Sequence, residues 1–429
     1  MIEGTFRSLR NPSYRTWAAG SLVSNIGTWV QRTAQDWLVL TQLTHRNATA
    51  LGVVMALQFG PHILLLPLTG SAADRFDRRR ILVATQSVMF VLATTLGLLT
   101  LFGAVALWHV YTFALLLGCV TAFDGPASQT FVSQLVGDED LSNAVGLNST
   151  SFNIARMVGP AIAGLMLASL GTGWAFMLNA LSYLAVLAAL WRLRAHARPA
   201  LPAGLAHAPQ GRAFVDGLRY VRSRPELVAI LWMLFLIGTF GFNFTIFIST
   251  MAVSVFHAGA SRYGLLMSIM AIGTISGSLL AARRRHPRIE ILLTSACVFG
   301  AGCALAAVMP TYGLFGAALM VIGVSALTFA NSTNSLLQLG TEPALRGRVM
   351  AMRLAIALGG TPIGAPIVGW VADTAGPRWA LGVGAASGVA AAAVCVNYLA
   401  RHRHLHIRLA AGRLRVAVDR AQESRPAEQ

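Results

Sequence analysis

The feature that most constrains this chain is a series of apolar stretches, each about 20 residues long, that continues along nearly its whole length. Only 11% of the 429 residues are charged, whereas soluble globular proteins carry about 25%. A helix of about 20 apolar residues spans the hydrocarbon core of a bilayer and bonds all of its backbone polar groups internally. We therefore predict an all-α membrane protein with about twelve transmembrane helices.

The apolar stretches fall into two sets of six that repeat one another. Phe123–Gly164 in the first set is matched, with small offsets, by Phe329–Gly369 in the second. This repetition predicts two pseudo-symmetric six-helix bundles, an arrangement found in many secondary transporters. The predicted spans are Trp17–Leu40, Leu51–Ala73, Ile81–Phe102, Trp108–Thr130, Leu141–Leu170, Trp174–Leu193, Leu227–Val255, Tyr263–Ala282, Ile289–Met309, Tyr312–Leu339, Val349–Val371 and Pro377–Leu399.

The chain divides into four segments on this basis. Residues 1–194 and 226–400 are the predicted bundles. Residues 195–225 are a predicted cytoplasmic linker with an amphipathic helix, because Phe214, Leu218 and Val221 recur at helical spacing. Residues 401–429 are a predicted basic cytoplasmic tail, which we expect to form a helix on anionic headgroups and then to become disordered.

The distribution of arginine predicts the orientation in the membrane. All 33 basic residues are arginine, and the net charge is +17. If both termini are inside the cell, about 27 of the 33 fall in cytoplasmic segments. We therefore predict a multi-pass protein of the bacterial plasma membrane with both termini cytoplasmic. Because the arginines lie in short loops between apolar spans, we expect a lipid bilayer as partner and no nucleic acid.

The link between the second and third spans has a recognisable pattern, Gly-x-x-x-Asp-Arg-x-x-Arg-Arg-x-x-Leu. Its key residues are Gly70, Asp74, Arg75, Arg78 and Arg79. The pattern resembles the helix 2–3 loop of the major facilitator superfamily, although Asp77 stands where that family usually has glycine. The resemblance implies a twelve-helix transporter of a small-molecule substrate. We expect such a transporter to be a monomer.

The same resemblance implies a conformational latch at the cytoplasmic side, in which Asp74 interacts with the start of helix 11. A helix N-terminus carries partial positive charge and favours a nearby carboxylate. Helix 11 is predicted to begin near Arg348, so Arg346 and Arg348 would strengthen the latch. Asp124, near the inner end of the fourth span, is another candidate partner for the helix 2–3 loop.

The first span carries a polar stripe at helical spacing, which is widened by Gln31 and Gln35. Its members are Ser21, Asn25, Thr28, Arg32 and Asp36. Such a face cannot point at lipid, so we expect it to line an aqueous cavity between the bundles. We interpret Asp36 as a proton-carrying carboxylate whose charge Arg32, four residues earlier, can neutralise. The alternatives are a structural ion pair and a carboxylate hydrated near the outer surface.

The fifth span carries a pattern of small residues with a proline. Its defining residues are Gly146, Gly159, Pro160 and Gly164, with Ala155 and Ala163 at positions between them. The pattern resembles the antiporter signature of the superfamily, with alanine replacing glycine at two positions. The resemblance implies contact with the opposite half and export by antiport, whereas the simpler interpretation is close helix packing. Arg156, one turn before Gly159, needs a carboxylate, a helix C-terminus or substrate as partner.

The seventh span is rich in aromatic residues. Phe240 and Asn243 are the main cavity candidates, with Phe244 and Phe247 below them. Aromatic rings with a few polar groups suit large, partly apolar substrates, although some of these rings must face lipid.

We find no pattern for a metal or cofactor. Cys119, Cys297, Cys303 and Cys395 all lie inside apolar spans and lack metal-ligand spacing, and no cluster of acids and histidines indicates an enzyme. One departure weakens the usual proton relay, because residues 115–122 contain no arginine in the fourth span.

Three short stretches resemble one bacterial branch of the superfamily, which contains the enterobactin exporter and macrolide efflux proteins. They are Trp29 to Leu38, Asp124 to Ala127 and Arg346 to Met350. The leading hypothesis is therefore proton-coupled export of small amphipathic molecules, such as drugs, antibiotics or siderophores. A nutrient importer of the same fold and a non-transporting scaffold or sensor are the alternatives.

Overall fold

The computed structural model describes residues 6–66, 68–69, 76–193, 210–282, 288–402, 405–410 and 413–418. The first half consists of η1 (Arg7–Arg10), α2 (Pro12–Trp37), η2 (Leu38–Leu43), α3 (Ala48–Leu64), α5 (Arg78–Leu101), α6 (Leu107–Leu135), α7 (Asp138–Ser169) and α8 (Thr172–Arg192). The linker contains α9 (Gln210–Ser223). The second half consists of α10 (Pro225–Leu236), η4 (Ile237–Gly241), α11 (Phe244–Thr250), η5 (Met251–Val255), α12 (Ala260–Ala282), α13 (Ile289–Val308), α14 (Tyr312–Leu339), α15 (Pro343–Thr374) and α16 (Pro377–His402).

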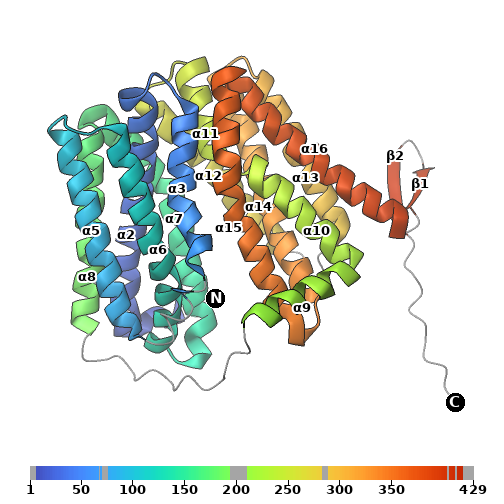
Figure 1. Ribbon diagram of the computed structural model, residues 1–429, viewed down its shortest axis with the longest axis horizontal. Helices are drawn as coiled ribbons and strands as arrows, with labels where there is room; N and C mark the ends of the chain where they lie inside the picture. Colours follow the sequence, from blue (N-terminus) through green and yellow to red (C-terminus); the bar gives the residue numbers. More distant parts are fainter. Residues whose placement is uncertain are drawn as a thin grey trace.

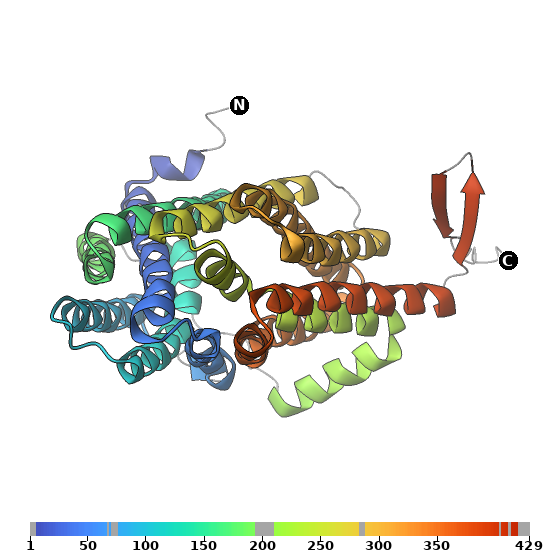
Figure 2. The same cartoon turned by 90° about the horizontal axis from the view of Figure 1, so that it is seen from above.

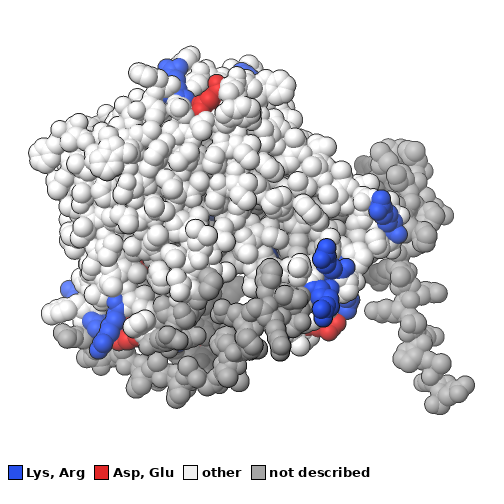
Figure 3. All heavy atoms as spheres, in the orientation of Figure 1, with Lys and Arg blue, Asp and Glu red and all other residues white. Residues whose placement is uncertain are grey.

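The prediction of an all-α membrane fold is confirmed. Ten helices among the described residues are long and apolar enough to span a bilayer, counting Pro225–Val255 as one. The polar α2 and the shorter α3 complete six segments in the first half. On the face shown in Figure 3, most charged atoms lie at the upper and lower ends, with a further basic group at the right edge, and the rest of the surface between them is almost uncharged. This uncharged surface is the kind that lipid requires.

Local sequence signals set where several helices begin. Asn11 caps α2 because its side chain accepts a 2.9 Å hydrogen bond from the Ser13 backbone N–H, and Pro12 takes the first helical position. Asn47 caps α3 in the same way, through a 2.8 Å hydrogen bond from the Ala50 N–H. Each cap satisfies a backbone donor that the helix itself leaves unbonded.

The two halves lie side by side and meet along two helix pairs (Figures 1 and 2). In the first pair, α3 packs against α15 so closely that a Cβ on Gly52 would collide with the backbone carbonyl of Ala365. In the second pair, α7 packs against α12, where the Ser268 hydroxyl donates a 2.8 Å hydrogen bond to the Met157 carbonyl. We call the face where α2 begins and α16 ends the terminal face, and the face where α3 begins and α15 ends the far face.

A carboxylate joins the two halves at the far face. Asp373, at the end of α15, accepts hydrogen bonds from the backbone N–H groups of Ala48 and Thr49 at 2.7 and 2.8 Å. It also accepts a 2.5 Å hydrogen bond from the Thr49 hydroxyl. The negative charge therefore sits on the positive end of the α3 dipole, which is a favourable placement. This contact holds the first and second halves together at the far face.

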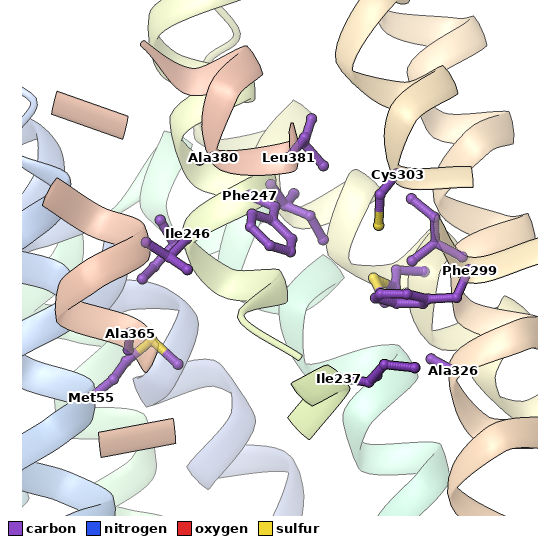
Figure 4. Close-up of a cluster of buried hydrophobic side chains, with 14 of the residues drawn as sticks. Met55, Ile237, Ile246, Phe247, Phe299, Cys303, Ala326, Ala365, Ala380 and Leu381 are labelled. Carbon is purple, nitrogen blue, oxygen red and sulfur yellow. The ribbon is translucent and has the colours of Figure 1, made fainter. Parts of the chain in front are cut away.

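The core of the second half is aromatic and aliphatic. Phe247 and Phe299 are each at most 1% exposed, and Figure 4 shows them packed with Cys303 and Leu381. Figure 4 also shows Met55 of α3 beside Ala365 of α15, across the junction of the halves. Phe247, expected near the cavity, therefore belongs to the packed interior of the second half.

Two expected boundaries differ from the structure. Helix α15 begins at Pro343, about one turn before the expected start near Arg348, because proline favours the first turn of a helix. Beyond His402 the described tail is not helical but forms an antiparallel hairpin of β1 (Leu405–Ala410) and β2 (Arg413–Val418). Alternating apolar and basic residues in these strands fit the two-residue period of a sheet better than a helix.

Candidate functional site

A central cavity of about 230 Å³ lies between the two halves. The first half contributes α2, α3 and α7, and the second contributes the α11 region and α12 to its lining. Its charged residues are Arg32, Asp36 and Arg156, and its aromatic residues are Trp29, Phe59, Phe242 and Phe244. The cavity therefore combines rings for an apolar body with charged groups of both signs.

Arg32 and Asp36 both line this cavity, as their spacing on one helix face predicted, but they do not form the expected ion pair. Among the described residues, their charged atoms are not within 4.0 Å of each other. The Arg32 guanidinium instead lies 5.3 Å from the Trp29 ring centroid and 5.6 Å from that of Phe59. Its Nε has no hydrogen-bond partner in the described part of the chain. A guanidinium held by two rings remains available to a ligand.

Asp36 is 8% exposed and contacts the opposite half. The hydroxyl of Tyr263, on α12, donates a long 3.4 Å hydrogen bond to its Oδ2. The Tyr263 ring stacks on Trp37 with centroids 5.8 Å apart, which fixes the phenol beside the carboxylate. A buried carboxylate whose one donor among the described residues lies 3.4 Å away is held at a high cost in desolvation.

Arg156 has partners, although not of the kind expected. Its Nη2 donates hydrogen bonds of 2.6 Å to the Thr274 hydroxyl on α12 and 3.0 Å to Asn153 on its own helix. Neither partner carries a compensating charge, and its Nε has no partner among the described residues. Arg156 thus links the halves at the cavity wall and keeps its positive charge unneutralised there.

The aromatic lining matches the prediction only in part, since Phe244 belongs to it but the two main candidates do not. Phe242 and Phe244, whose ring centroids lie 5.6 Å apart, line the cavity, whereas Phe240 and Asn243 do not. Asn243 is fully buried and donates a 2.7 Å hydrogen bond to the Thr239 carbonyl. The π-helical segment η4 inserts a wider turn just before these residues. The expectation for Phe240 and Asn243 was wrong because it assumed an uninterrupted α-helical period.

Part of the polar stripe on α2 faces other helices. Gln31 is 5% exposed and accepts a 2.6 Å hydrogen bond from Asn179 on α8. Gln35 is 3% exposed and lies outside the cavity lining. Gln31 is thus packed within the first half, and neither amide lines the central cavity, contrary to expectation. Asn25 does not line the central cavity. It lines a second, separate cavity within the first half.

A second cavity of about 150 Å³ lies among the helices of the first half. Asp124 lines it and accepts hydrogen bonds of 2.6 Å from Thr85 and 3.0 Å from Gln86, both on α5. Asp124 was expected to pair with the helix 2–3 loop, and its described partners lie beyond that loop instead. The polar residues that line this cavity are distributed over five separate helices, which is why sequence spacing gave no sign of it.

Only some of the residues expected to form the cytoplasmic latch lie within the part of the chain that the structure describes. Gly70, Asp74 and Arg75 lie outside the described residues. Arg79 donates a 2.9 Å hydrogen bond from its Nε to the Leu190 carbonyl, while Arg78 begins α5. Arg346 and Arg348 lie in the first turns of α15, and Arg348 packs beside Gly217 of α9.

The small residues of α7 bring it close to both halves. A Cβ on Gly159 would lie 2.5 Å from the Trp29 Cβ of α2, and one on Gly164 would lie 2.9 Å from the Ala260 carbonyl of α12. Pro160 lines the central cavity, and its carbonyl contacts Gly264 of α12. Gly146, nearer the terminal face, has no such neighbour. The part of α7 that packs against the opposite half is thus its far-face end.

Within the described residues there is no cluster of histidine, cysteine, aspartate or glutamate that could hold a metal ion. The four cysteines are free thiols.

Comparison with known proteins places this geometry in context. A family model described as "Transmembrane secretion effector" matches residues 3–409. The chain is 27% identical to the staphyloferrin A transporter of Staphylococcus aureus, over 83% of this chain and 89% of the relative. It is 24% identical to macrolide efflux protein A of Streptococcus pyogenes, over 85% and 90% of the two chains. It is also 24% identical to the enterobactin exporter of Shigella flexneri, over 77% and 78%.

Solved structures agree on the fold. A mutant of the nucleoside transporter NupG superposes with a TM-score of 0.74 at 14% identity, covering 90% of this chain and 99% of that one. A bacterial homologue of the iron transporter ferroportin, in an inward-facing state, superposes with a TM-score of 0.68 at 15% identity, covering 90% and 98%. At such low identity, these similarities establish the fold alone.

Proposed function

The chain belongs to the transmembrane secretion effector family of the major facilitator superfamily, and from that premise we propose that it exports small amphipathic molecules in exchange for protons. It is a multi-pass membrane transporter rather than an enzyme. Relatives named for siderophore transport, macrolide efflux and enterobactin export support the outward direction.

The observation that carries the proposal is the central cavity, which holds Asp36 beside Arg32 and Arg156 between the two halves. The aromatic rings offer an apolar surface to the body of a substrate, and the charged groups can bind its polar substituents. The cargo classes that fit best are drugs, antibiotics and siderophores, since these join rings or chains to polar groups.

Antiport requires that a proton and the substrate bind at the expense of each other. Asp36 can meet this requirement when a polar group of the substrate occupies its carboxylate in place of Tyr263. Protonation of that carboxylate from outside would then remove the binding partner and release the substrate. After the halves reorient, the protonated Asp36 carboxyl would release its proton to the cell interior.

The proposed direction of access rests on the arginine bias, which supports a cytoplasmic location for both termini and the terminal face. The contact of Asp373 with α3 joins the halves at the opposite side, and this supports our proposal that substrate loads from the cytoplasm. Reorientation would break this contact and form the cytoplasmic latch between Asp74 and the start of α15. A single chain carries both latches, so we propose a monomer as the working unit.

Inverted membrane vesicles test the proposal directly, because their outer surface is the cytoplasmic one. We expect an imposed proton gradient, acidic inside, to drive uptake of at least one of three probes: staphyloferrin A, enterobactin or erythromycin. Vesicles without the protein and vesicles treated with a protonophore are the controls.

Uptake that ignores the gradient would reject antiport. Movement only toward the cytoplasmic side would favour an importer, and no flux of any probe would favour a non-transporting scaffold or sensor.

A further inference from the structure

The second cavity lies next to two other spaces and shares lining residues with each. It shares Arg32 and Gln58 with the central cavity on one side. On the other side it shares Ser21, Asn25 and Ser128 with a polar hollow of about 350 Å³, which we call the vestibule. The vestibule also includes Asn148 and Ser149, near the terminal-face end of α7. The three spaces therefore follow one another from the terminal face to the middle of the molecule.

The walls of the second cavity are unusually polar for the interior of a membrane bundle. They carry hydroxyl groups from Ser24, Thr28, Thr121 and Tyr183, each of which can both donate and accept a hydrogen bond. The Gln86 Oε1 and Trp17 Nε1 atoms of two other lining residues have no partner among the described residues. Buried polar groups normally have partners, and about 150 Å³ leaves room for several water molecules.

Asp124 is the carboxylate of this space. Its two described hydrogen-bond donors, Thr85 and Gln86, are neutral, and no described arginine lies within ion-pair distance of it. The other ionisable groups that surround the cavity are Arg32 and Tyr183 in its wall and His62, whose Nε2 lies 3.4 Å from the Thr121 hydroxyl. Asp124 is half-buried inside the bundle, and a carboxylate held there without a cationic partner among the described residues is costly. Such groups mark ion or proton paths.

We propose that the vestibule and the second cavity form a proton conduit through the first half, in which Asp124 is a second proton-carrying carboxylate in series with Asp36. The Asp124 O–H bond would break toward water in the cavity, leaving the carboxylate hydrogen-bonded to Thr85 and Gln86, and the proton would leave through the vestibule. Arg32 and Gln58 border both cavities, so the conduit would meet the substrate cavity at these two residues. The inference rests on the proposed antiport and gives the proton a route separate from that of the substrate.

Asp124→Asn tests the carboxylate in the full chain reconstituted in liposomes, with whichever of the three probes the unaltered protein transports. We expect proton-driven accumulation to fall by about 100-fold, the usual scale for losing a positioned proton-transfer group. Exchange of internal for external probe without a gradient should continue, because the substrate cavity is intact. Asp124→Glu should restore accumulation, and Asp77→Asn, at an exposed helix cap, should leave it unchanged. Unaltered proton-driven accumulation in Asp124→Asn would overturn the inference.

A matched pair of leucine substitutions on α6 tests the conduit itself. Ser128→Leu would block the passage shared by the vestibule and the second cavity, whereas Ser133→Leu places the same side chain at an exposed position on the same helix. We expect only Ser128→Leu to slow proton-driven accumulation, with probe exchange preserved in both. Equal behaviour of the two variants would overturn the conduit.

A readout without transport separates this inference from the export proposal. Dicyclohexylcarbodiimide reacts with protonated carboxyl groups in apolar surroundings, and peptide mass spectrometry locates the adduct. Both proteins are exposed to the reagent while the bath is made acidic for a short pulse. We expect Asp124 to be labelled in the unaltered protein and to be labelled less in Ser128→Leu. Labelling of this kind without transport of any probe would reject export but support the conduit, whereas transport with Asp124 unlabelled would reject the conduit alone.

Discussion

Asp373 caps the helix that begins at Ala48, through a 2.7 Å hydrogen bond that crosses from the second half of the protein to the first. The cap lies at one end of the α3–α15 pair. The predicted latch of Asp74 lies at the other end of the same pair, since Asp74 follows α3 and would face the start of α15. If the predicted latch forms, each helix would offer a carboxylate to the N-terminus of its partner, and we expect the two contacts to alternate during transport.

The first prediction concerns Asp373→Ala. The substitution removes one of the two side chains that cap α3 and leaves Asn47, and loss of a cap typically costs about 0.5–2 kcal/mol. The population with an open far face should therefore rise by up to about 30-fold. Electron paramagnetic resonance distances between spin labels at Phe102 and Val308, both exposed near the far face, would report the change.

Asp373→Asn is the matched control for this prediction, because asparagine caps helices about as well as aspartate but lacks the charge. Its distance distribution should lie between those of the unaltered protein and the alanine variant. Identical distributions in all three proteins would show that the contact does not set the closed state.

The second prediction concerns Asp74→Asn. If the cytoplasmic latch closes on the start of α15, loss of the charge should reduce probe transport by about ten-fold or more, since a helix-end interaction contributes up to about 2 kcal/mol. The protein should still fold and insert, as judged by its yield and elution volume in detergent. Asp77→Asn, in the same link, should transport normally. Normal transport by well-expressed Asp74→Asn would remove the latch.

The third prediction concerns Asp36→Asn. If Asp36 carries the exchanged proton, the variant should lose proton-driven accumulation, and its probe binding should no longer depend on pH between about 5 and 9, a range in which amides do not titrate. Binding measured by calorimetry in nanodiscs at several pH values would test this. A pH dependence equal to that of the unaltered protein would transfer the role to another group.

The fourth prediction separates Phe242 from Phe240. Phe242→Ala removes a ring from the cavity wall and should weaken probe binding by about 3- to 10-fold, since aromatic contacts contribute about 0.5–1.5 kcal/mol beyond their buried area. Phe240→Ala, two residues away and outside the cavity, should bind the probe normally. Equal losses of affinity in both variants would place the binding surface elsewhere.

The fold was largely predictable because each membrane helix corresponds to one continuous apolar stretch of the sequence. The start of α5 and the end of α8 fall close to the predicted boundaries of Ile81–Phe102 and Trp174–Leu193. The site was less predictable. Helical spacing shows which residues share one face of a helix, but it does not show which helix or cavity that face meets. Gln31 and Arg32 are adjacent in sequence, yet Gln31 bonds to Asn179 and Arg32 faces the cavity. The Asp373 cap joins residues more than 300 positions apart and leaves no local pattern.

The first crossing of the second half has a further consequence. Two π-helical stretches, Ile237–Gly241 and Met251–Val255, enclose the short α11, and Phe242 and Asn243 leave the helical conformation between them. This crossing is therefore an interrupted helix rather than a continuous one, and Phe242 lies at the interruption. We expect a bulky cargo to be accommodated by bending there, while the rest of the bundle keeps its packing. One scaffold could in this way serve relatives whose cargoes differ greatly in size.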